Sequence, residues 1–357
     1  MTLRAKTVKE LRQKIEDYDY KRKSGMVFTS KPTVAEWIVV WWKNRTFSES
    51  VCSYRRPMIN KVIGPAIGHL KVADVKPEHI QQIMKSVEGR SESYNNKLYQ
   101  LLKQLFRDAR LNGLIIHNPC ETIKPGGIET AEKKAITAEQ FKKLTAATEG
   151  TRAYLFCMIG YYTGMRREEI CGLTWDHVYL EAASPYIHVE FATTWPTHSK
   201  GVWPSPLKSE KAKRKIPIHA ELQKALVAAK AVSKSDFVIP GSDGNVITHS
   251  SMRRLWGIVD DRTLPEYLPK SRIRDYRTDA TEEKGKKAPN AKKTIDFTVT
   301  PHILRHTFAT NLVASGLDIK KIQYLTGHSD ITVLLKIYAH VRENSPEELA
   351  DMINSSM

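Results

Sequence analysis

The chain has 357 residues, which exceeds the size at which a single hydrophobic core usually stops growing, so two or more domains are expected. Its 56 Lys and Arg against 39 Asp and Glu give a net charge of +17, which favours a polyanion such as a nucleic acid as partner. An anionic membrane surface, or solubility alone, would also fit this charge. No segment approaches the ~20 consecutive apolar residues of a membrane span, and no apolar signal core opens the chain, so we expect a soluble protein of the cytoplasm.

Cysteine spacing supports the same compartment. The four cysteines lie far apart and form no CxxC pair; they are Cys52, Cys120, Cys157 and Cys171. This spacing argues against a disulfide framework and against a zinc site.

Helical spacing of apolar residues dominates the first third of the chain. Residues 7–23 predict a charged helix that faces solvent or couples to a partner. Residues 31–124 predict a small all-helical domain, in which the apolar run 37–42 is a buried helix because it is too short to span a membrane. The basic residues on the polar faces of this domain either follow a phosphate backbone or form an ordinary solvated surface. They are Arg55, Arg56, Lys61, Lys71, Lys97, Lys103, Arg107 and Arg110.

A linker and a second domain are expected next. Residues 125–135 break the helical periodicity with a Pro-Gly-Gly sequence and a charged stretch. Thr137 then begins a helix as its N-cap, with Gln140 three positions later. Residues 186–191 and 215–218 predict short antiparallel strands around a basic turn, and the Lys-rich residues 279–294 predict an exposed, mobile loop. The predicted fold class is therefore mainly α with a small antiparallel β-sheet.

The last third contains a helix with a polar face. Thr300 precedes a proline and a glycine follows at position 316, which predicts a helix over residues 301–315. His302, Arg305 and His306 share one face of it, which is either an ordinary polar face or a site for one ligand. A metal site is disfavoured, because Arg305 would lie beside the ion and no HExxH carboxylate separates the histidines.

A second arginine lies in the upstream sequence TGMRREE. Gly164 suits a tight turn, and Glu169 lies in the first turn of the next helix, where acidic residues are favoured. Glu169 can orient Arg166, or a neighbouring histidine, through a charge-assisted hydrogen bond. The alternative is a routine surface ion pair.

Two further segments carry chemically useful groups. Residues 208–215 place several ammonium groups at a predicted hairpin, which either reaches into a DNA groove or is a solvated turn. Tyr338 follows His328 by ten residues, on a predicted short amphipathic helix. The apolar residues of that helix are Ile331, Leu334, Leu335 and Ile337.

Five motifs occur in one order along the chain: TGMRREE, KSEKAKRKIPI, TPHILRHTFAT, LTGH and IYAH. This order resembles that of the tyrosine recombinases, or phage integrase family. The resemblance covers residues 136–342, and residues 31–124 resemble the core-type DNA-binding domain of that family. It implies that this helical domain and an α+β catalytic domain clamp DNA. Residues 1–30 are interpreted as a coupling helix or a remnant of an arm-binding domain, and residues 343–357 as a tail that docks on a neighbouring protomer or on its own domain.

The resemblance also implies seven catalytic residues: Arg166, Glu169, Lys208, His302, Arg305, His328 and Tyr338. Arg166 and Arg305 correspond to the arginine pair of the family, and Glu169 to its acidic support. Two planar guanidiniums can hold the non-bridging oxygens of a phosphodiester with paired hydrogen bonds as negative charge develops on them.

The remaining groups suit attack by tyrosine. The resemblance makes Tyr338 the nucleophile, and a tyrosine needs a base or a positive field at neutral pH because its ordinary pKa is about 10. His302 is the candidate proton acceptor, and His328 is expected to hydrogen-bond a phosphate oxygen. Lys208 is the candidate proton donor to the leaving sugar oxygen, although two other lysines of the same turn compete with it.

The implied function is site-specific recombination of double-stranded DNA for integration or excision of a mobile element. A 3′-phosphotyrosine conserves the bond energy, so neither a cofactor nor a metal is expected. The expected assembly is a homotetramer on two DNA sites, nucleoid-associated in a bacterial cytoplasm, with accessory DNA-bending or directionality proteins as further partners. The alternatives are DNA relaxation as by a type IB topoisomerase, and a regulator that binds DNA without turnover.

Overall fold

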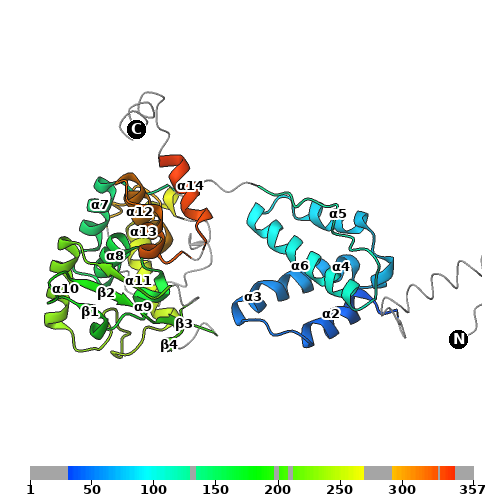
Figure 1. Ribbon diagram of the computed structural model, residues 1–357, viewed down its shortest axis with the longest axis horizontal. Helices are drawn as coiled ribbons and strands as arrows, with labels where there is room; N and C mark the ends of the chain where they lie inside the picture. The colour runs from blue at the N-terminus through cyan, green and yellow to red at the C-terminus, as the bar shows by residue number, and fades with distance from the viewer. Residues whose placement is uncertain are drawn as a thin grey trace, which may run out of the picture. The chain divides into compact units, whose positions relative to one another are not determined.

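The computed structural model describes residues 31–128, 134–196, 201–207, 212–268, 292–328 and 330–341. The chain divides into two compact units, Met1–Glu132 and Lys133–Met357, which we call the N-terminal and C-terminal units and describe separately (Figure 1). Several predicted features fall outside the described residues: the helix at 7–23, the loop at 279–294 up to residue 291, and the tail at 343–357.

The described part of the N-terminal unit is helical, as the sequence predicted. Its elements are α2 (Val34–Lys43), α3 (Glu49–Met58), a π-helical turn (Ile59–Ile63), α4 (Gly64–Ile67), a 3-10 turn (Val72–Asp74), α5 (Pro77–Ser86) and α6 (Glu92–Leu111). Buried apolar side chains from all four longer helices and from the turns form one core.

Helix α2 is joined to α6 by its tryptophans. The indole Nε1 of Trp41 donates to Asp108 Oδ2 at 2.7 Å, and that of Trp37 donates to the Leu105 carbonyl at 3.2 Å. Both tryptophans are buried, which confirms that the run 37–42 is a core helix. Val39 and Val40 of the same run are exposed, so only one face of this helix is in the core.

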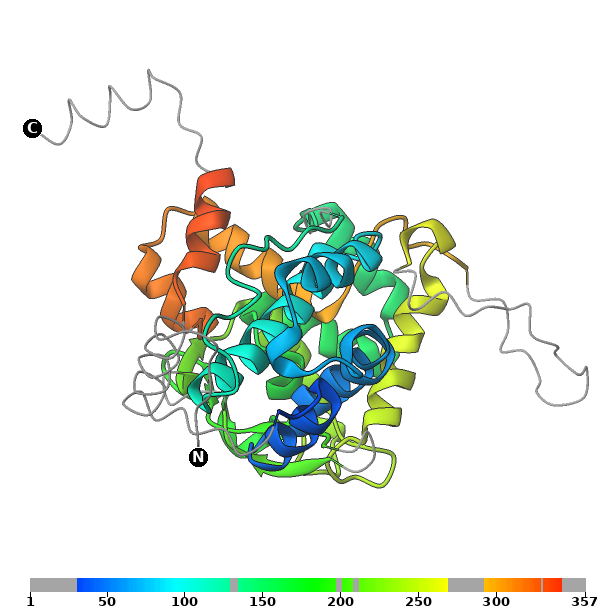
Figure 2. The same ribbon diagram turned by 90° about the vertical axis from the view of Figure 1, so that its right-hand side faces the viewer.

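The C-terminal unit combines helices with two small antiparallel sheets (Figures 1 and 2). Its helices are α7 (Ala138–Thr148), α8 (Arg152–Thr163), α9 (Arg167–Cys171), α10 (Ala220–Val232), α11 (His249–Arg262), α12 (Pro301–Ala314), α13 (Ile319–Thr326) and α14 (Thr332–Val341), with 3-10 turns at Trp175–His177 and Pro265–Tyr267. Its strands are β1 (Val178–Tyr179), β2 (Tyr186–Val189), β3 (Ala192–Thr194), β4 (Val202–Ser205) and β5 (Arg214–Pro217).

The two predicted strands are confirmed as the antiparallel pair β2 and β5, in a sheet of order β1-β2-β5. Ile187 is opposite Ile216, and Val189 is opposite Arg214. The prediction placed the start of the second strand one residue late and missed the separate β3-β4 pair. These are short strands, and their alternation is difficult to recognise in sequence.

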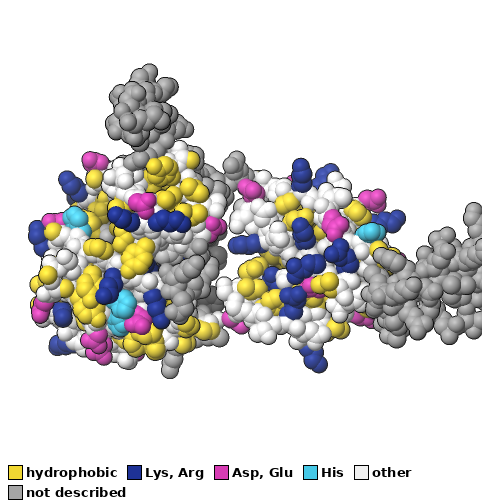
Figure 3. Space-filling view, viewed as in Figure 1, with side chains coloured by type: hydrophobic (Ala, Val, Ile, Leu, Met, Phe, Trp, Pro, Cys, Tyr) yellow, Lys and Arg dark blue, Asp and Glu magenta, His cyan; other side chains and the backbone are white. Residues whose placement is uncertain are grey.

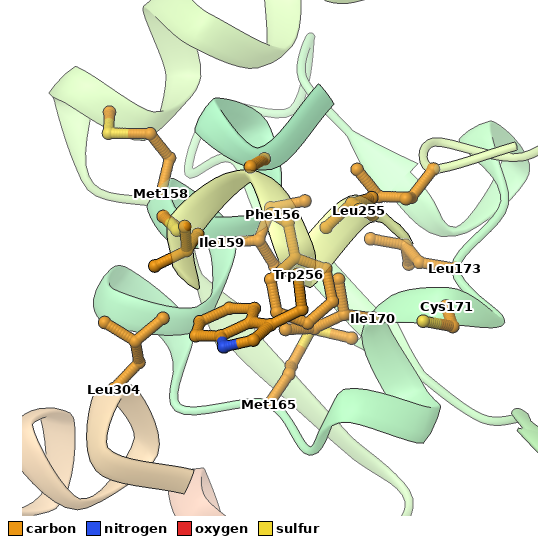
Figure 4. Packing of buried hydrophobic residues seen from close by; sticks show 14 of the residues in the cluster. Phe156, Met158, Ile159, Met165, Ile170, Cys171, Leu173, Leu255, Trp256 and Leu304 are labelled. Atoms are coloured by element: carbon orange, nitrogen blue, oxygen red, sulfur yellow. The ribbon is translucent and has the colours of Figure 1, made fainter. Parts of the chain in front are cut away.

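Helix α8 is the centre of the core. Phe156 of α8 packs edge-on against Trp256 of α11, with ring centroids 5.7 Å apart (Figure 4). Leu304 of α12 lies against α8 at Gly160, where an added Cβ would be 3.0 Å from a Leu304 methyl carbon. This close approach holds α12 beside the end of α8, from which the first arginine motif continues.

The capping predictions are confirmed at two helices. Thr137 and Gln140 form a capping box at α7. The Thr300 hydroxyl accepts from the Ile303 amide at the start of α12.

Candidate active site

The first arginine projects from a turn that glycine makes possible. Gly164 ends α8 in the left-handed conformation at φ 59°, and a Cβ there would lie 2.4 Å from Phe308 Cδ1 of α12. Arg166 is the N-cap residue of α9, and its backbone amide donates to Glu169 Oε2 at 2.9 Å. The turn therefore fixes both the Arg166 backbone and the distance between α9 and α12.

The second arginine comes from α12 and contacts the same turn. Arg305 is buried, and its Nη1 donates to the Gly164 carbonyl at 2.8 Å. Its Nη2 is also buried and has no hydrogen-bond partner among the described residues. Burial, with Arg166 and Arg214 nearby, lowers the pKa of Arg305 to about 9, so the side chain stays protonated at neutral pH.

Glu169 links two arginines in the interior. Its Oε1 accepts from Arg166 Nη1 at 2.7 Å, and its Oε2 accepts from Arg214 Nη2 at 2.8 Å. Glu169 is only 2% exposed, so this is not a surface ion pair. Burial by itself raises the pKa of Glu169, but the charge and hydrogen bonds of Arg214, followed by those of Arg166, outweigh it and lower the pKa to about 2.

Arg214 is a site residue that the sequence reasoning missed. It was treated as one more charge of a basic turn, but its side chain is buried and contacts three segments. Besides Glu169, its Nη1 donates to the Ala212 carbonyl and its Nε donates to the Leu325 carbonyl at 2.8 Å. The alternation along β5 carries the relevant signal, since Arg214 shares the inward face with the buried Ile216.

The LTGH segment, residues 325–328, also contacts this group of arginines. Arg166 Nη2 donates to the Gly327 carbonyl at 2.6 Å. The Thr326 hydroxyl donates to the Ile322 carbonyl, so it accepts from His328 Nδ1 at 2.8 Å, which leaves Nε2 of the neutral ring as an acceptor. Burial, and then the charges of Arg305 and the other arginines, lower the pKa of His328 to about 3.

The remaining predicted residues are placed as follows. His302 is exposed near the start of α12, close enough to His328 for their charges to interact. Tyr338 is half-buried on α14 and packs against an apolar cluster of side chains from α12, α13 and α14. These three helices lie together in Figures 1 and 2. Leu334 and Ile337 belong to that cluster, but Leu335 is 48% exposed, so its predicted place on the apolar face is wrong.

Lys208 and its competitor Lys211 lie outside the described residues, and Lys213 is exposed. Within the part of the chain that the structure covers, no group of three or more His, Cys, Asp or Glu is arranged to hold a metal ion. All four cysteines are buried and free.

Comparison with known proteins identifies the family. Residues 134–345 match the model of the phage integrase family, and residues 32–125 match that of the phage integrase central domain. The chain belongs to the phage integrase family. It is therefore a tyrosine-type site-specific recombinase, an enzyme of mobile elements that breaks and rejoins DNA.

Three similar proteins illustrate the relationship. A tyrosine recombinase XerC-like protein of Caldanaerobacter subterraneus subsp. tengcongensis is 24% identical over 97% of this chain and 90% of its own length. The Tn1549 transposon integrase in complex with a circular intermediate DNA has a TM-score of 0.71 at 21% identity, over 91% of this chain and 99% of the other. A lambda integrase tetramer bound to a Holliday junction has a TM-score of 0.60 at 15% identity, over 97% of this chain and 91% of the other.

The charge balance of this recombinase's site favours an anionic ligand. The charged groups that act on Arg305 are Arg166, Arg214 and Glu169, so three guanidiniums face one carboxylate. His328 adds no positive charge near neutral pH. A buried excess of positive charge is costly unless an anion offsets it, and a phosphodiester carries one negative charge with oxygens that match a guanidinium.

Proposed function

We propose that this recombinase cleaves one strand at a time by attack of Tyr338 on a phosphodiester, forming a 3′-phosphotyrosine and freeing a 5′ hydroxyl. The observation that carries this proposal is the set of three guanidiniums around one buried carboxylate, with a buried donor of Arg305 left without a partner among the described residues. Negative charge develops on the non-bridging oxygens during attack, and pre-positioned donors of this kind stabilise it.

Each arginine has a distinct part in the proposal. Arg305 binds the phosphate through the donor that Gly164 does not occupy. Arg166 is held by Glu169 and by the Gly327 carbonyl, and its side chain is 28% exposed, so it can still reach a ligand. Because the two arginines are fixed to the same turn, one phosphate can contact both.

The histidines and the lysine move protons in this proposal. His302 is exposed at the start of α12 and accepts the proton of Tyr338. His328 is neutral without DNA, but a bound phosphate offsets the arginine charges and raises its pKa, so the ring gains a proton and donates to a phosphate oxygen. Lys208 protonates the leaving sugar oxygen.

The N-terminal unit is the proposed second DNA-binding part, corresponding to residues 31–124. Several Lys and Arg side chains are scattered over its visible face, among mostly uncharged atoms (Figure 3). A pocket of about 540 Å³ lies between α3 and α6, where Lys97 lies over the ring of Tyr54. Arg55 lines the same pocket, and two of its buried nitrogens have no partner among the described residues. These donors suit phosphate or base contacts.

The proposed assembly is a homotetramer on two double-stranded DNA sites, in which residues 31–124 and 136–342 of each protomer clamp the duplex. The similarity to a lambda integrase that forms a tetramer on a Holliday junction supports this stoichiometry. The similarity to a transposon integrase bound to a circular intermediate supports integration or excision of a mobile element. Accessory DNA-bending or directionality proteins would act on this assembly.

Covalent trapping tests the proposal. A nicked suicide duplex lets the cleaved strand diffuse away, so the enzyme stays attached to DNA. The wild-type protein should form a denaturant-resistant adduct, and Tyr338→Phe should form none while binding DNA normally. Tyr267→Phe is the matched control, because Tyr267 is partly exposed in the 3-10 turn Pro265–Tyr267 and should be trapped like wild type. An adduct that persists in Tyr338→Phe would show that another residue is the nucleophile, and supercoil relaxation without recombinant product would favour the topoisomerase alternative.

A further inference from the structure

We propose that Arg214 is a positioning residue for strand cleavage, which holds Arg166 and the segment before His328 in register through Glu169 and the Leu325 carbonyl. This inference rests on the phosphotyrosine chemistry proposed above, but it concerns a residue outside the seven expected catalytic positions. Arg214 itself is buried behind the network and acts through the groups that it holds.

The contacts of Arg214 join three segments that are distant in sequence. Its two terminal nitrogens donate to the two carboxylate oxygens of Glu169, at 2.8 Å to Oε2 and 3.3 Å to Oε1. Its Nε donates to the last turn of α13 at Leu325. Because Arg214 belongs to β5, these bonds connect the sheet to the start of α9 and to the end of α13.

Hydrogen bonds of Glu169 and of the LTGH segment connect Arg214 to Arg166, one of the proposed phosphate-binding groups. Glu169 binds both the backbone amide and the guanidinium of Arg166, so the direction of Arg166 depends on where that carboxylate lies. The Gly327 carbonyl, next to His328 in the chain, accepts a hydrogen bond from Nη2 of Arg166. Arg214 therefore fixes the positions of both Glu169 and the LTGH segment, the two groups that hold the Arg166 guanidinium.

The packing and hydrogen bonds around residue 214 fit the planar guanidinium of an arginine. Its guanidinium packs on Gly327, where an added Cβ would lie 3.0 to 3.3 Å from the guanidinium atoms. Gly327 also has a φ of 63°, a conformation that side chains disfavour. A lysine would keep the charge but has no planar fork to bind both carboxylate oxygens and a backbone carbonyl at once.

The decisive experiment measures the single-turnover rate of trapping for Arg214→Lys on the nicked duplex. We expect a loss of roughly 10- to 100-fold, because small misplacements of a catalytic group have effects of this size, with DNA affinity unchanged. Arg253→Lys is the matched control, since Arg253 is exposed on α11, and should react like wild type. If wild type itself forms no adduct, the proposed function fails; if wild type and Arg214→Lys are trapped equally fast, only this inference fails.

A double-mutant cycle separates positioning from general weakening of the fold. Because Arg214 holds both Arg166 and the segment before His328, adding Arg214→Lys to Arg166→Lys should cause a smaller loss than Arg214→Lys causes on its own, since one of the two positioned groups is already impaired. Losses that simply multiply would overturn the inference. Should Arg214→Lys fail to fold, Gly327→Ala decides, since its methyl group displaces the Arg214 guanidinium without removing a charge. A folded Gly327→Ala protein with the wild-type trapping rate would then refute the role of Arg214.

Discussion

Replacing Glu169 by Gln tests the buried charge network in depth. The change keeps the shape of the side chain but leaves Arg214 without a buried counter-charge. The pKa of Glu169 falls from 4.5 to about 2, a difference of about 2.5 units, and at 1.36 kcal/mol per unit this corresponds to about 3 kcal/mol of stability at neutral pH. Removal of one partner from a buried ion pair typically costs about 3–5 kcal/mol, which agrees.

Thermal unfolding of the full-length protein measures this cost. For a unit of the size of Lys133–Met357, about 3 kcal/mol corresponds to a fall in Tm of about 6–12 °C. Glu168→Gln is the matched control, because Glu168 is paired with Arg167 at the surface, and surface changes usually stay within about 0.5 kcal/mol.

The pH dependence has a definite sign. Because the pKa of Glu169 is lowered in the folded state, its contribution is complete above the unfolded value of 4.5 and is lost as the pH falls toward about 2. The Tm difference between wild type and Glu169→Gln should therefore be constant from pH 5 to pH 8. Equal Tm values for the two Gln variants would refute the account of a buried, ionised Glu169.

Three further predictions concern other parts of the structure. Gly164→Ala should lower the unfolding free energy by about 1–3 kcal/mol more than Gly150→Ala, since both glycines have positive φ but only Gly164 would clash with Phe308; equal losses in chemical denaturation would contradict this. His328 should remain neutral, with its proton on Nδ1, from pH 5 to pH 8 in the DNA-free protein, and an NMR titration midpoint near the ordinary pKa would contradict its placement. The double variant Arg55→Gln and Lys97→Gln should weaken DNA binding and reduce the slope of log binding constant against log salt concentration by about 2, whereas Lys85→Gln on α5 should leave both unchanged. An unchanged slope in the double variant would exclude the α3–α6 pocket from the DNA interface.

Much of the fold was predictable because local signals agreed with one another. Thr137 and Thr300 were recognised as N-caps from sequence, and both begin helices in the structure. The apolar spacing of the first domain predicted its helices, and the strand-forming residues of 186–191 and 215–218 predicted the central strand pair, with bounds one or two residues off. Each of these features depends on neighbouring residues, which a sequence displays directly.

The site was predictable only in part. Arg166 and Glu169 are three residues apart, so their contact follows from helix geometry. The contact of Arg305 with Gly164 spans 141 positions and arises because glycines at 160 and 164 let α12 approach α8. Composition and spacing do not reveal such an approach; only the motif order, through its resemblance to a family, suggested that Arg305 and Arg166 belong together.

Arg214 shows why the rest was missed. A lysine- and arginine-rich turn is usually solvated, and the predicted strand began at residue 215, so the alternation that places Arg214 on the same face as Ile216 was not applied to it. The side chain is buried because β2 lies beside β5 and Glu169 supplies a counter-charge, and both conditions are tertiary. The exposure of Leu335 has the same origin, since α12 and α13 cover only one face of α14.

The central claim is that the Tyr338 hydroxyl attacks a phosphate bound by Arg166 and Arg305. The most direct test is mass spectrometry of the trapped adduct after nuclease and protease digestion. The account predicts a nucleotide 3′-phosphate attached to Tyr338 in wild type, and little adduct when Arg166 or Arg305 is replaced by Gln. A nucleotide attached to any other residue, or a 5′-phosphate linkage, would contradict it.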